Sequence, residues 1–428
     1  MRQFLARNEF KHDLFRNDLE RISPEIEKTY EEIVRPYSAT FTLYFYDPEK
    51  GAPGVDTALR LRSYTDMPDS SATFSDLKAM PWHVEHKDGG QKTNVADVDH
   101  LAAANGNTSD ALRVLNETHV ANLLKVEQRR HFAIGPEKDE RHRMTVDARR
   151  LVYKIDGDDV LLLGDLGPRI EVKLPADVSE DGLDVVSDIK SRAFWLPFGA
   201  FELYMEYVLR EAIDANSYLS RPEMEVKHTI EGDPVETFRA IHEWVGSASS
   251  GGSHMLPNPH AYSRARRYHL CKGPDSDCDY TVVETRAGRC SLKVKCGARP
   301  SGTALVRETT ASHTTDTDGY LGDPVTFIAQ QGLERLNTFR KSQLKTVLLR
   351  PNQHLYQFSV DQCVDVAGRI LNQLEIEFAG TLRGVSPAPT EQILEEMQQI
   401  SEALRRSPAG KALAPTHTAK FAFFTGSA

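Results

Sequence analysis

The sequence lacks several features that would place it in a specialised class of protein. No stretch approaches the roughly 18 consecutive apolar residues that a membrane helix needs. The N-terminal residues MRQFLARNEFKHD contain no apolar segment of the kind found in signal peptides. No CxxC pair occurs, and all five cysteines follow residue 250. We therefore expect no membrane segment in this chain, reduced thiols and a cytoplasmic location.

A surplus of basic charge is also missing. Lysine and arginine number 52 against 62 aspartate and glutamate, which gives a formal net charge of −10. Proteins that bind nucleic acid along their surface usually carry more positive than negative charge. We therefore expect no nucleic-acid partner, and any polyanion site must be a local concentration of cations in an acidic protein.

The chain is long enough for two or three domains, and its composition changes once. Residues 246–260, GSASSGGSHMLPNPH, have no apolar pattern and predict a flexible linker. The linker separates a domain at 1–245 from a second at 261–428. Both halves are rich in alternating, β-branched segments typical of strands, with helices expected at 17–37, 107–127, 197–214, 233–245 and 391–406.

The strands of the first half have strongly charged faces. In RMTVDARR, residues 143–150, Arg143, Thr145, Asp147 and Arg149 are expected on one face, and Glu171 and Lys173 share a face of RIEVKLP. One interpretation is an antiparallel sheet with a solvated side. The other is a closed antiparallel barrel with its charges inward, where buried cations need an anionic guest such as phosphate and the acids hold a divalent cation.

The order of these segments resembles a known family. RNEFKHDL, LYFYDPE, ALRLRSY, VEHKDGGQK, RHRMTVDARRLVY and IEVKLP follow one another as in the VTC-type polyphosphate polymerase domain of the triphosphate tunnel metalloenzyme superfamily. The resemblance covers roughly residues 1–230. It implies an eight-stranded antiparallel tunnel with a basic interior that holds a phosphate chain and a metal ion.

The resemblance also implies roles for individual residues. The cations that would grip phosphoryl oxygens or set the field along the tunnel are Arg60, Arg62, Arg143 and Arg150, with Lys11, Lys87, Lys92 and Lys173. Glu171 would hold Mg²⁺ or Mn²⁺, with Glu9 and Glu85 as further ligands or as ion-pair partners of Lys11 and Lys87. The family's late lysine has no clear match, and Lys227, with Arg221, is the substitute in this sequence.

The second half resembles a more distant branch of the superfamily, the CYTH type. SLKVK, ALVRETT, FRKSQLK and QLEIEF follow that order, and Glu375 and Glu377 share a face. The opening ExExK motif is missing from AYSRARRYHLCK, so this half is expected to be a degenerate tunnel. Cys271, Cys278, Cys290 and Cys296 are expected to be thiols. The predicted fold class is thus α+β, with two closed antiparallel barrels and peripheral helices.

Three functions remain open at this stage. The first is polymerisation of polyphosphate from the γ-phosphate of ATP, in which the chain end attacks without a general base. The second is hydrolysis of tripolyphosphate or a nucleoside triphosphate, with Asp147 or Glu85 orienting water. The third is non-catalytic binding of polyphosphate. Mn²⁺ or Mg²⁺ is the expected cofactor, and a homo-oligomer is left open.

Overall fold

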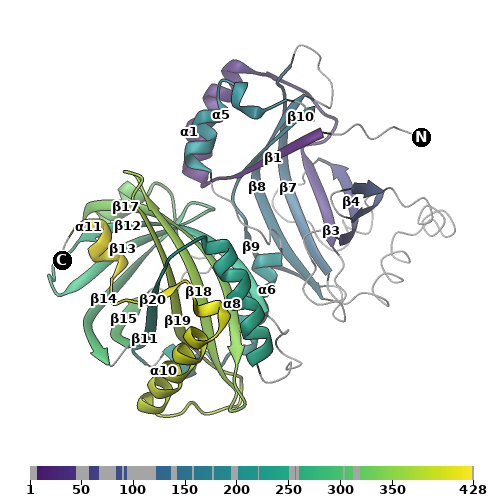
Figure 1. The fold of residues 1–428 in the computed structure, drawn as a ribbon. Coiled ribbons are helices and arrows are strands. Elements are labelled where there is room, and N and C mark those ends of the chain that lie inside the picture. Colours follow the sequence, from purple (N-terminus) through teal and green to yellow (C-terminus); the bar gives the residue numbers. More distant parts are fainter. Residues whose placement is uncertain are drawn as a thin grey trace. The chain divides into compact units, whose positions relative to one another are not determined.

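A computed structural model of the chain shows two compact units (Figure 1). The residues that it describes are 7–44, 57–66, 83–88, 91–93, 122–135, 142–156, 159–175, 178–193, 201–219, 221–249, 256, 260–301, 304–311 and 319–426. Unit 1 comprises Met1–Ala200 with Arg286–Gly288, and unit 2 comprises Phe201–Thr285 with Arg289–Ala428. The contacts therefore divide the chain near residue 200 and not at the predicted linker.

Unit 1 contains one antiparallel sheet in the order β1-β10-β8-β7-β3-β4-β5-β6. Its strands are β1 (Arg7–Asp13), β2 (Glu31–Glu32), β3 (Ala39–Tyr44), β4 (Thr57–Thr65), β5 (His83–Asp88), β6 (Gln91–Thr93), β7 (Asn122–Ala133), β8 (Arg143–Asp156), β9 (Asp159–Asp165) and β10 (Arg169–Pro175). Among the described residues, β1 and β6 do not pair, so the predicted closed barrel is not seen in this unit. Residues 122–127 were expected to end a helix but begin β7, because this segment pairs with both β3 and β8.

The apolar side of this sheet packs under two helices, α1 (Arg16–Thr29) and α5 (Val186–Arg192) (Figure 1). Leu19, Ile22 and Ile26 recur at helical spacing on α1 and contact the apolar side of β8 and β10. The charged side of these strands is shielded too, since Asp147 is only 1% exposed. The interpretation of a solvated face is therefore wrong for β8 and β10.

Unit 2 contains a ring of eight antiparallel strands. The sheet runs β13-β12-β17-β18-β19-β11-β15-β14, and β14 also pairs with β13, so the pairings return to their first strand. These strands are β11 (Glu223–Ile230), β12 (His260–Lys272), β13 (Cys278–Thr285), β14 (Arg289–Ser301), β15 (Ala304–Ala311), β17 (Glu334–Leu349), β18 (His354–Asp365) and β19 (Ile370–Thr381). Two short strands, β16 (Tyr320–Leu321) and β20 (Leu413–Pro415), pair with β14 and β11.

The placement of β11 explains the shifted boundary. Its residues Glu223–Val226 pair with β15 and its residues Glu225–Thr229 pair with β19, both of them strands of the second half. The helices of unit 2 are α6 (Phe201–Ala212), α7 (Asn216–Leu219), α8 (Pro234–Ala248), α9 (Pro324–Gln330), α10 (Thr390–Arg406) and α11 (Lys420–Thr425). None of the helices in the described part of the chain is long and apolar enough to cross a membrane.

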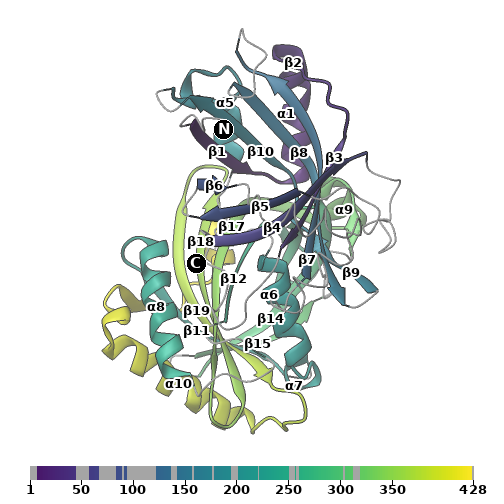
Figure 2. The same ribbon diagram turned by 90° about the vertical axis from the view of Figure 1, so that its right-hand side faces the viewer.

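Alternation along the strands separates an outer from an inner face of the ring. On the outer face, the row Thr346, Phe358, Ile376 and Val226 is registered across four neighbouring strands. Helix α8, capped by the Asp233 carboxylate, covers this row through contacts such as Trp244 on Phe358. Helix α10 covers the adjacent strands, and Figure 2 shows both helices beside the ring. The hydrophobic core of unit 2 thus lies largely outside the ring.

The inner face carries the opposite set of residues. The corresponding inner row is Lys345, Ser359, Glu375 and Lys227. Apolar clusters border this polar section along the strands. Helix α6 covers one of them, which includes Tyr262, Val347 and Leu355. Side-chain alternation therefore places charges inside the ring and apolar groups under the helices.

Two cysteines differ from their predicted state. Cys278 and Cys296 stand directly opposite each other on β13 and β14 and form a disulfide, whereas both were expected to be thiols. Their register allows the disulfide to form, because facing residues of an antiparallel pair have Cβ atoms about 4.5–5.5 Å apart. Cys271, Cys290 and Cys363 are free and buried, and the thiol prediction is confirmed for Cys271 and Cys290.

Candidate functional site

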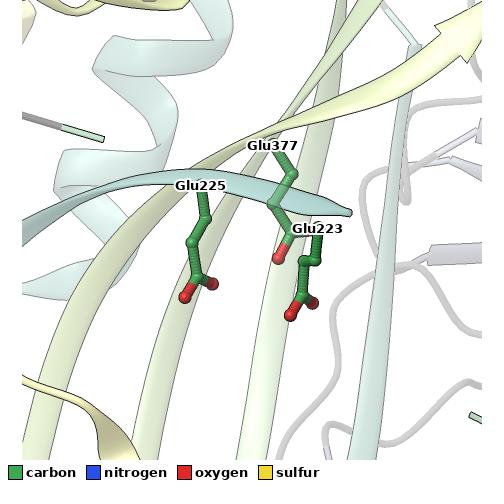
Figure 3. Close-up of side chains that lie close together, drawn as sticks. All are labelled: Glu223, Glu225 and Glu377. Carbon is green, nitrogen blue, oxygen red and sulfur yellow. The ribbon is translucent and has the colours of Figure 1, made fainter. Parts of the chain in front are cut away.

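Three glutamates come together on the inner face of unit 2. Glu223 and Glu225 lie on β11, and Glu377 lies on the neighbouring strand β19, directly opposite Glu225. One carboxylate oxygen from each lies within 4.8 Å of the other two. Figure 3 shows the three side chains close together. Like charges facing each other across a strand pair are destabilising unless a cation separates them. We refer to these residues as the glutamate triad.

Burial intensifies the repulsion in the triad. Glu225 is 1% exposed. Burial raises the pKa of Glu377, and the neighbouring carboxylates of Glu375 and Glu223 raise it further. Within the described residues, Glu377 makes no ion pair. A divalent cation, which takes carboxylate oxygens as ligands, would satisfy the charge of this group, so the residues fit a metal site.

Lysines from neighbouring strands face the triad. Glu223 pairs with Lys293 at 3.2 Å and Lys295 at 2.5 Å, both on β14. Lys227 contacts Glu225 at 2.9 Å and Glu375 at 3.3 Å. Although burial raises the pKa of Glu223, Lys295 and Lys293 outweigh it and hold that pKa well below its usual range. The triad therefore lies among cations that an anion could also bind.

A second charged group lies further along the inner face. Asp361 of β18 is fully buried and contacts Lys341 at 3.4 Å and Lys420 at 2.9 Å. Lys420 also contacts Glu375 at 2.5 Å. Burial raises the pKa of Glu375, but Lys420 and Lys227 reverse the shift and keep the group ionised. Glu375 thus connects the Asp361 group to Lys227 of the triad region.

Two further cations belong to the same face. Arg264 on β12 forms an ion pair with Glu206 of α6. Lys345 of β17 lies over the ring of Tyr262, 5.6 Å from its centroid. Burial and the nearby Arg264 lower the pKa of Lys345 well below its usual value. A phosphate beside Lys345 would favour its charged form, because an opposite charge stabilises the ammonium ion.

The structure adds an acidic segment to the second half, which was predicted to be a degenerate tunnel. An ExExK pattern is present as Glu223, Glu225 and Lys227, in a segment that the sequence pattern assigned to the first half. Lys227 was predicted to bind substrate in the first tunnel but lies on the inner face of unit 2. Glu375 and Glu377 share a face as predicted. The alternating EMEVK segment was the signal that could have located the triad.

Four predicted residues of unit 1 form a mixed-charge cluster. Glu9 and Lys11 on β1 face Lys173 and Glu171 on β10. Lys173 forms an ion pair with Glu171, and Glu9 lies 3.3 Å from Lys11 and 3.9 Å from Lys173. The predicted metal ligands Glu9 and Glu171 are thus paired with lysines. Among the described residues, unit 1 has no group of three or more acids, histidines or cysteines close enough to share a metal ion.

Arg150 is engaged within the protein. Its guanidinium donates to the Asp13 carboxylate at 2.5 Å and to the carbonyl oxygens of Gly167 at 2.7 Å and Leu166 at 3.1 Å. Asp13 also accepts two bonds from Arg169. Asp147, proposed to orient water, accepts two hydrogen bonds from Arg129. The guanidinium of Arg150 and the carboxylate of Asp147 are therefore bound by neighbouring groups of the protein, whereas they were predicted to bind a phosphate and to orient a water molecule.

The remaining predicted residues are only partly described. Arg62 on β4 and Arg143 on β8 are half-buried, and both lie on the charged side of their strands. The side chains of Arg60, Glu85, Lys87 and Lys92 lie outside the described residues. Their strands register Arg60 opposite Glu85 and Lys87 opposite Lys92. The structure thus leaves their roles as predictions.

Comparisons with known proteins give only weak likenesses. No family model matches the chain, and no curated protein does. One solved structure is the PH1819 protein from Pyrococcus horikoshii OT3, at 11% identity and a TM-score of 0.27, covering 42% of this chain and 88% of that one. Another is the mimivirus capping enzyme triphosphatase, at 8% identity and a TM-score of 0.28, covering 48% and 98%. Likenesses at this level assign neither a fold nor an activity to this chain.

Proposed function

We propose that unit 2 hydrolyses the terminal phosphoryl bond of a triphosphate with the help of a divalent cation. The observation that carries this proposal is the glutamate triad on the inner face of a strand ring, with the buried Lys227 and the half-buried Lys293 and Lys295 around it. A triphosphate brings oxygens that coordinate a cation and oxygens that accept bonds from lysine and arginine. The triad and its cations match both kinds of oxygen.

The proposed ligands of the cation are Glu223, Glu225 and Glu377. Mg²⁺ and Mn²⁺ are both candidates, since each takes carboxylate and phosphate oxygens. When bound, the cation would neutralise charge on the phosphates. A cation at the triad would also replace lysines as the partner of Glu223 and Glu225, which would leave Lys227, Lys293 and Lys295 available to phosphate oxygens.

The cations further along the inner face would hold the phosphate chain. Lys341 and Lys345 are buried, so their attraction to a phosphate is weakly screened by water. Positioning and charge neutralisation dominate catalysis of phosphoryl transfer, which requires no covalent intermediate on the protein. In hydrolysis, water forms a bond to the terminal phosphorus while the bond to the bridging oxygen breaks.

The test is release of orthophosphate by the purified chain. Tripolyphosphate and ATP are supplied separately with Mg²⁺ or Mn²⁺, and Glu377→Gln is compared with the wild type. We expect Glu377→Gln to lower the rate at least about a hundredfold, because loss of even an indirect metal partner commonly costs tenfold to a hundredfold. Chelation of the metal should have a similar effect.

Glu391→Gln is the matched control, since Glu391 is an exposed glutamate on α10, a helix that covers the outer face of the ring. It should leave the rate unchanged. Full activity in Glu377→Gln, or activity that survives complete removal of divalent cations, would refute the proposal.

Polymerisation of polyphosphate from ATP in unit 1 stays a prediction from the sequence. The buried Lys125 and the half-buried Arg129 on the charged side of β7 suit a polyanion, although both pair with Glu127 in the structure. The same reactions, resolved on a gel, distinguish the candidates. Orthophosphate alone supports hydrolysis, long chains support polymerisation, and binding of polyphosphate without turnover supports a binding module.

A further inference from the structure

One end of the inner face changes from charged to apolar. Leu270, Phe339, Cys363 and Leu371 lie on β12, β17, β18 and β19, in the same alternation as the inward-facing charges. Phe339, for example, follows the pattern of Lys341, Gln343 and Lys345. These apolar residues therefore face the inside of the ring, beyond the Asp361 group.

The C-terminal helix α11 packs on this apolar end. Phe424 is 1% exposed, and its ring stacks on Phe339 with centroids 4.6 Å apart. The carbonyl oxygen of Phe424 accepts bonds from Asn337 and Arg369, both at 2.7 Å. Phe421 and Phe423 add to the same cluster. Figure 1 shows α11 beside the ends of β12 and β17. The helix thus joins strands that meet at one end of the ring.

Lys420 extends this contact into the charged interior. It begins α11, and its ammonium group reaches both Asp361 and Glu375. Upstream of the helix, the Thr418 carbonyl accepts a bond from Gln373, which also lies on the inner face. The C-terminal segment therefore places the apolar side chains of α11 and the ammonium group of Lys420 at the same end of the ring.

Exposure along the inner face shows from which side solvent reaches the site. The side chains of Glu223, a member of the triad, and of its partner Lys293 are 17% and 31% exposed. Asp361, beside Lys420, is 0% exposed. Solvent therefore reaches the charged face beside Glu223 and Lys293, whereas Asp361 is fully enclosed and Lys420 is only 12% exposed.

We propose that residues 416–425 plug one end of the ring and make the binding site blind-ended. This inference rests on the proposed function and names its substrate class, which is triphosphates and the ends of phosphate chains. A long polyphosphate can insert a terminus beside Lys420 but cannot pass through the ring. Lys420 acts as a specificity-determining cation at the closed end.

The experiment measures how many protein molecules bind one phosphate chain. A linear polyphosphate has two ends, so the intact protein should saturate at two copies per chain whatever the chain length. Sedimentation with polyphosphates of two defined lengths, under metal conditions without turnover, gives this stoichiometry. Phe424→Asp, which places a charge in the apolar cluster, should release the plug and give more copies on the longer chain.

Lys411→Gln is the matched control, because Lys411 is an exposed lysine in the same C-terminal region. It should behave as the wild type. If circular dichroism shows that Phe424→Asp fails to fold, Lys420→Gln tests the closed end instead, with weaker binding of tripolyphosphate as the expected result.

The outcomes separate the two proposals. Absence of tripolyphosphate binding by the intact protein overturns the proposed function together with the plug. Tripolyphosphate binding with more than two intact copies per long chain overturns the plug alone. Two copies for both the wild type and a folded Phe424→Asp also overturn it, because the end would then be closed without α11.

Discussion

At the scale of single residues, the acids of the two units differ in how their charge is balanced. In unit 1, Glu171 and Asp147 have nearby basic partners in Lys173 and Arg129. In unit 2, Glu377 faces Glu225 and makes no ion pair with any described residue. The two charges of an ion pair balance each other without a ligand, whereas carboxylates that face each other are stabilised by a bound cation. This difference moves the candidate site from unit 1 to unit 2.

A buried histidine makes the stability of unit 2 sensitive to acid. His228 lies on the outer side of β11, where its ring contacts the Ser401 hydroxyl of α10. Burial, with a contribution from Arg405, lowers the pKa of His228 to about 4. In the unfolded chain the pKa is about 6.5. The unfolded state therefore binds the proton first, and stability falls as the pH drops from about 6.5 to about 4.

We expect this histidine to cost about 2–3 kcal/mol of unfolding free energy across that interval. Urea denaturation at a series of pH values measures it. His228→Gln should lose less stability than the wild type over the same interval. Parallel pH profiles for the two proteins would exclude the histidine as the cause.

At the scale of elements, the ring depends on the pairing of β13 with β14. The eight strands are hydrogen-bonded in one path that begins at β13 and ends at β14. The pairing of β13 with β14 joins the two ends of that path. The Cys278–Cys296 disulfide links the same two strands across 18 residues of sequence. A cross-link of this span restricts the unfolded chain as well as holding the ladder.

Reduction of this disulfide should therefore destabilise unit 2. A loop of this length corresponds to about 3 kcal/mol in the chain-entropy description. Urea denaturation with and without a reductant measures the change. The double variant Cys278→Ser/Cys296→Ser should match the reduced wild type and be insensitive to the reductant. Equal midpoints for the oxidised and reduced wild type would contradict the expectation.

At the scale of the whole molecule, the two units should contribute unequally to phosphate chemistry. Glu171→Gln in unit 1 and Glu225→Gln in unit 2 remove the same charge from comparable positions on charged strands. We expect Glu225→Gln to lower tripolyphosphate hydrolysis at least about a hundredfold. Glu171→Gln should change the rate less than about twofold. The opposite ranking would return the catalytic site to unit 1.

The alternation of charged and apolar residues was readable from the sequence. It predicted β8, β10 and β19 as strands, and it placed Arg143, Thr145 and Asp147 together on one face of β8. Arg149 was expected on the same face, but it is exposed, because the register of β8 against β7 shifts between Asp147 and Arg149. The shared face of Glu375 and Glu377 was predicted in the same way. Local patterns give the identity and sidedness of a strand because the side-chain period of two is a local property.

The alternation pattern could not predict which strands are neighbours. EMEVK was visible in the sequence, but its Lys227 was assigned to the first half because it precedes the apparent linker at 246–260. Pairing of β11 with β19 joins residues about 150 positions apart, and alternation carries no information on such a partner. For this reason the contacts divide the chain near residue 200 and not at 246–260, and the acidic motif belongs to unit 2.

The sequence by itself determined that this protein is built largely of antiparallel strands with one charged and one apolar face. Only the tertiary structure decided that Glu223, Glu225 and Glu377 meet, that Lys420 reaches Asp361, and that the charges of unit 2 face inward. The physical reason is that alternation fixes the two sides of a strand, while hydrogen-bonded partners and covering helices decide which side is enclosed.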